Sequence, residues 1–299
     1  MNWAVFQIAS GRVFFVAIAL LVAAVLFRNR SSPRVRRVAN WFLLLGLISL
    51  SVSAAPQPPW AYAVMALSLA VGLFASRFQT FSRAATAISA IGLVVVAINE
   101  SRYHVMPVLR KVDVRQIAVI GDSITAGYGG GDSTQKWPAI IRERHRTAVQ
   151  DLSRMGETAA SAAKQLEQTS VEAPVVIIEI GGNDFLGRGS IQSFELGLDS
   201  ILKALCEPKR QVVMFELPIP PLYEGYGRVQ RNLASRYGVA LIPKRVLLSV
   251  VEAAEATVDS IHLTQQGHDQ MASFVWALLE PVLPQESRQP ELSNAADSR

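Results

Sequence analysis

Cysteine is nearly absent from this chain of 299 residues, because Cys206 is the only one. A single cysteine excludes an internal disulfide and says nothing about the redox compartment. Cys206 falls at the end of a predicted helix, in "ALCEPKR", with no partner motif around it. The sequence therefore favours a buried small apolar residue over a nucleophile at this position.

Histidine is also scarce, with four residues in the whole chain. Neither His104 nor His145 has partners at the spacing of a metal site, so we predict no metal, and we expect no other cofactor. His268 falls in a predicted helix, where surface exposure or packing is a simpler interpretation than catalysis.

Acidic residues are almost missing from the first 115 positions, which hold 12 Lys/Arg and 2 Asp/Glu, whereas the remaining positions hold 17 and 22. Such asymmetry indicates two parts with different surroundings. The basic part is also the apolar part, and it has no basic patch interleaved with aromatic residues. Its arginines are therefore typical of membrane flanks and not of nucleic-acid binding.

Polar residues are scarce in four apolar stretches, at 8–27, 38–55, 60–75 and 84–98. Each is near or slightly below the ~20 residues that cross a bilayer. A soluble bundle would show polar residues at every third or fourth position, and these stretches do not. Residues 1–100 therefore predict a transmembrane anchor of about four helices, with three or five spans as alternatives, and residues 101–115 a linker. The first stretch is followed by a basic run and not by a cleavage site, which argues against a signal peptide.

The arginines predict the orientation of this anchor, because cytoplasmic loops carry an excess of basic residues. The connection "RNRSSPRVRR" holds five of them, and Arg77 and Arg83 flank the third and fourth stretches on the same side. The uncharged turn "APQPPW" should lie on the other side. This arrangement places the amino terminus and everything after Ile98 outside the cytoplasm.

Short β-rich runs alternate with amphipathic helical segments from Gln116 onward, which is typical of a parallel sheet covered on both faces. Residues 116–283 therefore predict one α/β domain, and residues 284–299 a polar, disordered tail. The predicted strands are 116–120, 147–152, 174–180, 211–217 and 238–242. The predicted helices are 137–145, 158–168, 191–205, 222–237, 244–254 and 264–280.

Small and polar residues follow the first three strands, at the edge of a parallel sheet where chemistry gathers. Gly121-Asp122-Ser123 follows the first strand, Gly156 the second, and Gly181-Gly182-Asn183-Asp184 the third. Asp259 and His262, in "DSIHLTQQGH", precede the last helix.

These positions supply the groups that acyl transfer needs. Ser123 is the candidate nucleophile and His262 the candidate base, and Asp259 could orient the imidazole through its other nitrogen. The backbone N–H groups of Ser123 and Gly156 and the side-chain amide of Asn183 could form the oxyanion hole.

Other interpretations of these residues need fewer assumptions. Ser123 alone could be a turn serine, and "GDSITAGYGGG" is neither a phosphate loop nor a Gly-x-Ser-x-Gly elbow. Asp122 and Asp184 should hydrogen-bond the turns, and Trp137 should pack in the core. Glu179, on an otherwise apolar strand, must find a partner or lie at the strand end.

The ordered set "GDSITAGYG", a glycine after the second strand, "GGND" and "DSIHLT" resembles the SGNH (GDSL-type) hydrolase family, and within it the bacterial thioesterase/lysophospholipase branch. The resemblance covers residues 116–283. It implies a three-layer, flavodoxin-like α/β/α sandwich with five parallel strands, preceded here by an all-α membrane segment, and ester or thioester hydrolysis without a metal. The family's roles would fall on Ser123, Gly156, Asn183, Asp259 and His262.

The sequence therefore predicts a serine esterase anchored in a bacterial inner membrane, with its hydrolase domain in the periplasm. The predicted partners are the lipid bilayer and an ester substrate, either a lysophospholipid-like acyl ester or an O-acetylated envelope glycan; no nucleic acid is expected. An acyltransferase with the same triad and a non-catalytic membrane sensor or scaffold are the alternatives.

Overall fold

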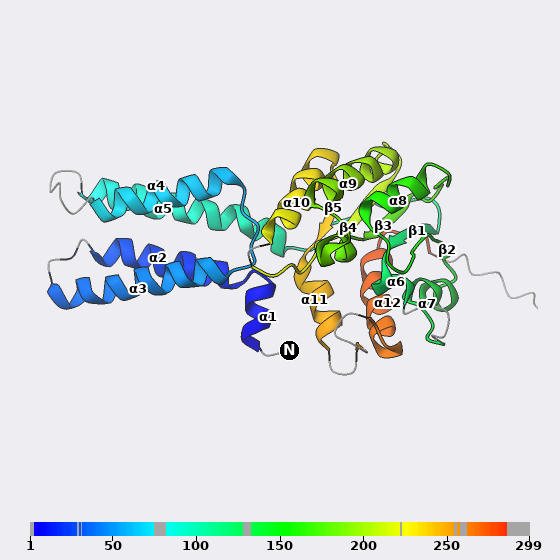
Figure 1. Ribbon diagram of the computed structural model, residues 1–299, viewed down its shortest axis with the longest axis horizontal. Coiled ribbons are helices and arrows are strands. Elements are labelled where there is room, and N and C mark those ends of the chain that lie inside the picture. Colours follow the sequence, from blue (N-terminus) through cyan, green and yellow to red (C-terminus); the bar gives the residue numbers. More distant parts are fainter. Residues whose placement is uncertain are drawn as a thin grey trace, which may run out of the picture.

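The computed structural model describes residues 3–28, 30, 32–74, 82–127, 133–221, 223–253, 256–257 and 262–285. Long apolar helices from the first hundred residues form one part, and a sheet flanked by helices forms the other (Figure 1). Residues 286–299 of the predicted disordered tail and the predicted triad residue Asp259 lie outside the described residues.

Helices α2 to α5 of the first part occupy the four apolar stretches. Helix α2 (Val13–Arg28) packs against α3 (Pro33–Val52), and α4 (Pro59–Phe74) against α5 (Ser82–Ser101). By length and composition, α3 and the segment Arg83–His104 can each cross a membrane, and the bent pair of α1 (Trp3–Ala9) and α2 would be a third span. Helix α4 is apolar but shorter. Two or three helices among the described residues therefore qualify as spans, and four spans stay a prediction.

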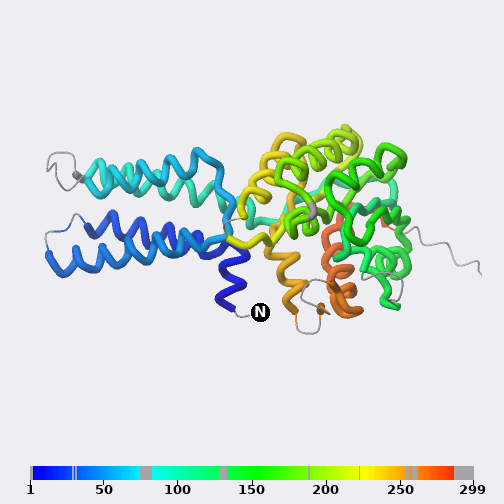
Figure 2. The backbone as a smooth tube through the Cα atoms, in the orientation of Figure 1, coloured from blue at the N-terminus to red at the C-terminus, as the bar shows by residue number. Residues whose placement is uncertain are grey.

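The first apolar stretch, predicted as one helix over 8–27, is divided in the structure. Helix α1 ends at Ala9 and α2 begins at Val13, with an angle of 82° between them. Gly11 allows this bend because its φ is +80°, in the left-handed region that glycine adopts at little cost. Helix α1 therefore turns away from the helical bundle, as Figure 2 shows.

The second part contains a sheet of five parallel strands in the order β2-β1-β3-β4-β5. The strands are β1 (Gln116–Gly121), β2 (Ala148–Asp151), β3 (Val175–Glu179), β4 (Gln211–Phe215) and β5 (Ala240–Ile242). Strand β3 is buried along its whole length, as its continuous apolar run predicts for a central strand covered on both faces.

Helices cover both faces of this sheet, so the domain has three layers. On one face, alternate strand residues such as Val119 and Ile177 pack against α7 (Trp137–Arg144), α11 (Lys244–Glu252) and α12 (Gln265–Leu279). On the other face, Ile120 and Ile178 pack against α8 (Ala159–Leu166), α9 (Ile191–Leu205) and α10 (Glu224–Tyr237). The predicted α/β/α sandwich with five parallel strands is confirmed. The six predicted helices match α7 to α12 to within two residues at either end.

A buried ion network joins the two parts. Arg231 on α10 contacts Glu216, just after β4, with 2.7 Å between Nε and Oε1, and Glu100 in the last turn of α5, with 2.7 and 3.0 Å to its carboxylate oxygens. Its Nη1 also donates to the carbonyl oxygen of Pro56, at 3.1 Å, and its guanidinium lies 3.7 Å from the ring centroid of Tyr103. At most 3% of each charged side chain is exposed.

The loop between α3 and α4 inserts into the same junction. The ammonium group of Lys244, the first residue of α11, donates to the carbonyl oxygen of Ala54. Gln57 donates to Glu100, with 2.6 Å between Nε2 and Oε2. A Cβ atom at Gly227 on α10 would lie 2.7 Å from Pro56 Cγ, so only glycine allows the loop to approach this closely. These contacts attach the α/β domain to the helical part.

Candidate active site

Three loops meet at the carboxyl edge of the sheet, because β1 pairs in parallel with both β2 and β3. Beyond the ladder, the N–H of Asp122 donates to the carbonyl oxygen of Glu179 at 3.1 Å, and that of Arg154 donates to Gly121 at 3.0 Å. The predicted site segments after the first three strands therefore lie side by side.

Ser123 is the first residue of α6 (Ser123–Ala126), a single turn that follows β1 directly. The Asp122 side chain caps this turn by accepting from the N–H of Ile124, at 3.0 Å, and 7% of Ser123 is exposed. Gly121 is required here, because an added Cβ atom would lie 2.6 Å from Cβ of Thr125. A tight strand-to-helix turn therefore fixes the backbone of Ser123.

Gly156 and Asn183 are brought together by a hydrogen bond between their loops. The amide Nδ2 of Asn183 donates to the carbonyl oxygen of Glu157 at 3.0 Å, and Gly156, one residue earlier, has a φ of +76°. Gly182 in turn lies against Asp122, whose Oδ2 would be 2.9 Å from an added Cβ atom. One series of contacts thus links the segments of Ser123, Asn183 and Gly156.

His262 lies in a short segment before α12 and is partly buried. This segment is fixed by a bridge between Thr257 and Leu263 and by a 2.8 Å hydrogen bond from the N–H of Thr264 to Ala256. Because Asp259 lies outside the described residues, the Ser123-His262-Asp259 arrangement stays a prediction. His268 is fully buried, and its Nδ1 lies 3.4 Å from the backbone nitrogen of Trp137, so of the two predicted roles, surface exposure and packing, the structure shows packing.

Glu179 forms a feature that the sequence did not explain, a buried carboxyl group beneath the Ser123 turn. Its Oε2 accepts from Oγ1 of Thr125 at 2.9 Å, and the Thr125 Oγ1 in turn accepts from Nε1 of Trp137 at 3.1 Å. Burial and the neighbouring Asp122 carboxyl raise the pKa of Glu179 well above its usual value. Burial likewise raises the pKa of Asp122 to about 6. A neutral Glu179 beneath the turn avoids two adjacent buried charges.

Replacing Glu179 with glutamine should preserve the fold and reduce the pH dependence of its thermal stability. The amide oxygen can still accept from Thr125, and the amide N–H can stabilise the Asp122 carboxylate. The raised pKa of Glu179 stabilises the folded state at low pH, and this contribution is lost as pH rises above the ordinary value of 4.5. Because glutamine does not titrate, the melting temperature of the variant should fall less with rising pH than that of the wild type.

Thermal unfolding in detergent at a series of pH values measures this difference. Glu172→Gln is the matched control, because Glu172 is exposed just before the same strand. An identical pH slope for Glu179→Gln and the wild type would show that Glu179 does not titrate with a raised pKa in the folded state.

An apolar pocket of about 250 Å³ opens beside the Ser123 turn. Ile124 and Gly182, which line it, are the chain neighbours of Ser123 and Asn183. Its other lining residues are apolar and come from three segments: Phe185, Leu186, Leu217, Pro218, Ile219, Leu247, Leu248 and Val251. The pocket can accept a hydrocarbon chain next to the candidate nucleophile.

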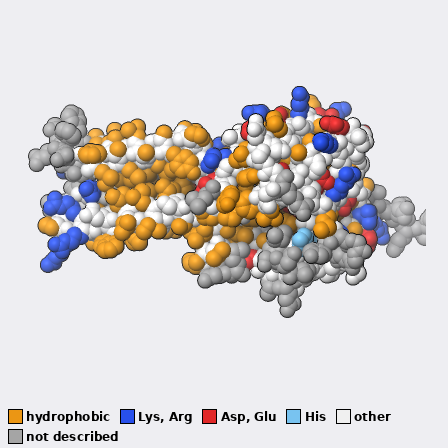
Figure 3. Space-filling model, viewed as in Figure 1, with side chains coloured by type: hydrophobic (Ala, Val, Ile, Leu, Met, Phe, Trp, Pro, Cys, Tyr) orange, Lys and Arg blue, Asp and Glu red, His pale blue; other side chains and the backbone are white. Residues whose placement is uncertain are grey.

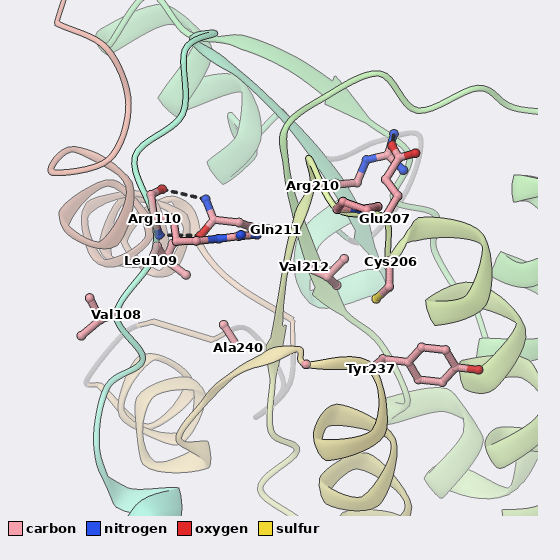
Figure 4. A pocket seen from close by; sticks show the side chains of 12 residues that line it. Val108, Leu109, Arg110, Cys206, Glu207, Arg210, Gln211, Val212, Tyr237 and Ala240 are labelled. Atoms are coloured by element: carbon pink, nitrogen blue, oxygen red, sulfur yellow. Dashed lines mark hydrogen bonds and ion pairs between the residues drawn. The ribbon is translucent and has the colours of Figure 1, made fainter.

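A larger cavity, of about 680 Å³, lies elsewhere. It surrounds the amino end of β4, where Gln211 pairs with the backbone of Arg110 (Figure 4). Cys206 lines it, and burial raises the pKa of this thiol, which opposes a thiolate nucleophile. This cavity is at the opposite edge of the sheet from Ser123, so it is no candidate for the acyl site.

Comparisons with known proteins agree on the α/β part of the chain. The sequence profile of the GDSL-like lipase/acylhydrolase family matches residues 119–270. Esterase TesA of Pseudomonas aeruginosa is 28% identical over 181 residues, which cover 56% of this chain and 89% of that protein. Thioesterase 1/protease 1/lysophospholipase L1 of Escherichia coli K12 is 24% identical over 204 residues, 63% of this chain and 98% of that protein. A crystal structure of TesA aligns with a TM-score of 0.49 and 27% identity, over 56% of this chain and 99% of that chain.

Proposed function

The chain belongs to the GDSL-like lipase/acylhydrolase family, and from this premise we propose that it is a membrane-anchored serine esterase with Ser123, His262 and Asp259 as its catalytic triad. Membership makes it a serine hydrolase that acts on esters. The observation that carries the assignment of the site is the contact between the Ser123, Gly156 and Asn183 loops beside an apolar pocket.

The proposed reaction proceeds through an acyl-enzyme. His262 takes the proton of the Ser123 hydroxyl as its oxygen attacks the ester carbonyl, and Asp259 orients the imidazole. The proton passes to the departing alcohol when the ester C–O bond breaks, and a water molecule, activated by His262, then releases the acid and restores Ser123.

The oxyanion hole would consist of the N–H groups of Ser123 and Gly156 and the amide of Asn183. One N–H of that amide donates to the carbonyl oxygen of Glu157. This bond orients the amide and leaves its second N–H for the oxyanion.

The substrate is an acyl ester whose chain occupies the apolar pocket. The names of the relatives include esterase, thioesterase and lysophospholipase, and the lining of the pocket suits a hydrocarbon chain. We take a lysophospholipid-like acyl ester as the first candidate and an O-acetylated envelope glycan as the second.

Covalent labelling tests the proposed nucleophile. A fluorophosphonate probe should label the detergent-solubilised protein, and mass spectrometry should locate the label on Ser123. Labelling of another residue would contradict the proposed mechanism, and labelling of Ser123 without turnover of any p-nitrophenyl ester would favour a non-catalytic scaffold.

For localisation, we propose residues 1–100 as an inner-membrane anchor, 101–115 as the linker and 116–283 as a periplasmic domain. The apolar helices α3 and Arg83–His104 support the anchor, and the arginines at the end of α2, at the start of α3 and in the connection between them support this orientation. Alkaline phosphatase, which is active only in the periplasm, should be active when fused after Arg299. A fusion with a fluorescent protein that folds only in the cytoplasm should be dark, and a bright fusion would reverse the orientation.

A further inference from the structure

Helix α1 has the features of a helix that lies on a bilayer surface. It leaves α2 at an angle of 82°, so it runs along the membrane plane when α2 crosses it. Trp3 is 75% exposed and Val5 is 47% exposed on α1. Tryptophan is enriched at membrane–water interfaces, and short apolar helix faces bind there.

Helix α11 begins beside α1 and beside the loop between α3 and α4. Its first residue, Lys244, is hydrogen-bonded to Ala54 in the loop where the chain passes from α3 to α4. The N–H of Ala54 donates to the carbonyl oxygen of Ile8 on α1, at 3.3 Å. Helix α11 also packs against α1. The start of α11 therefore lies where the apolar helices end.

Helix α11 also lines the apolar pocket, through Leu247, Leu248 and Val251, which follow Lys244 on the same face of the helix. A helix rises about 1.5 Å per residue, so Val251 is at most roughly 10 Å from Lys244 along the axis. This distance is comparable to the thickness of one headgroup layer, which is roughly 5–8 Å. The pocket therefore begins close to the surface of the bilayer.

Hydrophobic side chains continue from the helical bundle onto the part of the domain where α1 and α11 lie (Figures 1 and 3). Among the described residues, the pocket is lined by apolar side chains and Gly182, and none of these residues offers a polar side chain that could recognise sugar hydroxyls. Its volume of about 250 Å³ is below the usual ~300–1,000 Å³ of ligand pockets, which suits one acyl chain and not two.

We propose that the acyl chain of a single-chain ester lipid enters the pocket from the bilayer, passing from the leaflet beneath α1 along α11. This inference rests on the proposed esterase function and adds the route by which its substrate reaches the site. The ester carbonyl then reaches Ser123 while the polar headgroup stays at the membrane surface.

The experiment uses the full chain reconstituted in phosphatidylcholine vesicles, with palmitoyl lysophosphatidylcholine in the same vesicles and p-nitrophenyl butyrate in solution. The variant Trp3→Gln/Val5→Gln removes the exposed apolar residues of α1 without touching the site. It should hydrolyse the lysolipid about tenfold more slowly, because less apolar area holds α1 on the bilayer, and p-nitrophenyl butyrate at the wild-type rate. The matched control, Leu196→Gln on α9, also removes an exposed apolar side chain (63% exposed) and should change neither rate.

The outcomes separate this inference from the function on which it rests. Equal lysolipid rates for the wild type and the α1 variant would overturn entry beside α1 and leave the esterase intact. Faster wild-type hydrolysis of an O-acetylated glycan than of the lysolipid would overturn the lipid substrate class. No turnover of any ester, p-nitrophenyl butyrate included, would refute the esterase function itself.

Discussion

Replacing Ser123 with alanine should lower kcat for p-nitrophenyl ester hydrolysis by about 10⁴- to 10⁶-fold, the loss expected when a triad nucleophile is removed. The methyl group cannot form the acyl-enzyme, whereas the proposed oxyanion donors stay in place and leave residual catalysis. Fluorophosphonate labelling should disappear in the same variant. Steady-state kinetics in detergent, with in-gel detection of the probe, measure both effects.

The fold should survive this substitution, because Ser123 contributes its backbone to the turn and Asp122 supplies the cap. Ser200→Ala, at an exposed serine on α9, is the control and should retain full activity and labelling. Activity of Ser123→Ala within tenfold of the wild type, at an equal melting temperature, would remove Ser123 as the nucleophile.

Replacing Arg231 with methionine should lower the free energy of unfolding by about 3–5 kcal/mol, the range measured when one partner of a buried ion pair is removed. The reason is that the carboxylates of Glu100 and Glu216 would stay buried, 0% and 1% exposed, without the guanidinium that pairs with both. The carbonyl oxygen of Pro56 would also lose its donor. Thermal or urea unfolding of the purified protein in detergent measures the loss.

The same helix supplies a matched control. Arg236 pairs with Asp199 at 3.2 Å, but 62% of its side chain is exposed. Arg236→Met should therefore cost no more than about 1 kcal/mol. Adding Glu100→Gln and Glu216→Gln to Arg231→Met should restore part of the stability, because neutral amides are less costly to bury than unpaired carboxylates. Equal losses for Arg231→Met and Arg236→Met would show that the junction is not held by this network.

The Arg231 network also bears on the proposed substrate route. Glu216 is followed directly by Leu217, Pro218 and Ile219, which line the acyl pocket. Glu100 belongs to α5, and Pro56 to the loop between α3 and α4. Arg231 therefore connects the wall of the pocket with the ends of the apolar helices. A substitution of Arg231 should disturb the packing of the pocket wall and of the helix ends.

Much of the fold could be predicted from local patterns. Continuous apolar runs and amphipathic periods identified the five strands and six helices, because those patterns depend on which faces each segment buries. Glycines and small polar residues after the strands placed Ser123, Gly156 and Asn183 at one edge. The single turn α6 and the helical turn over Asp184–Arg188 were missed, because segments this short have no readable period.

The sequence by itself determined the apolar stretches, the α/β class and the family, because hydropathy, periodicity and short motifs are properties of neighbouring residues. Tertiary structure alone decided the strand order, the bend at Gly11, the apolar pocket and the buried partners of Glu179 and Arg231. Glu100 and Arg231 are 131 positions apart, and nothing near either residue shows that they meet. Such contacts arise only when packing brings distant segments together and excludes water, and that exclusion makes a buried charge depend on its partner.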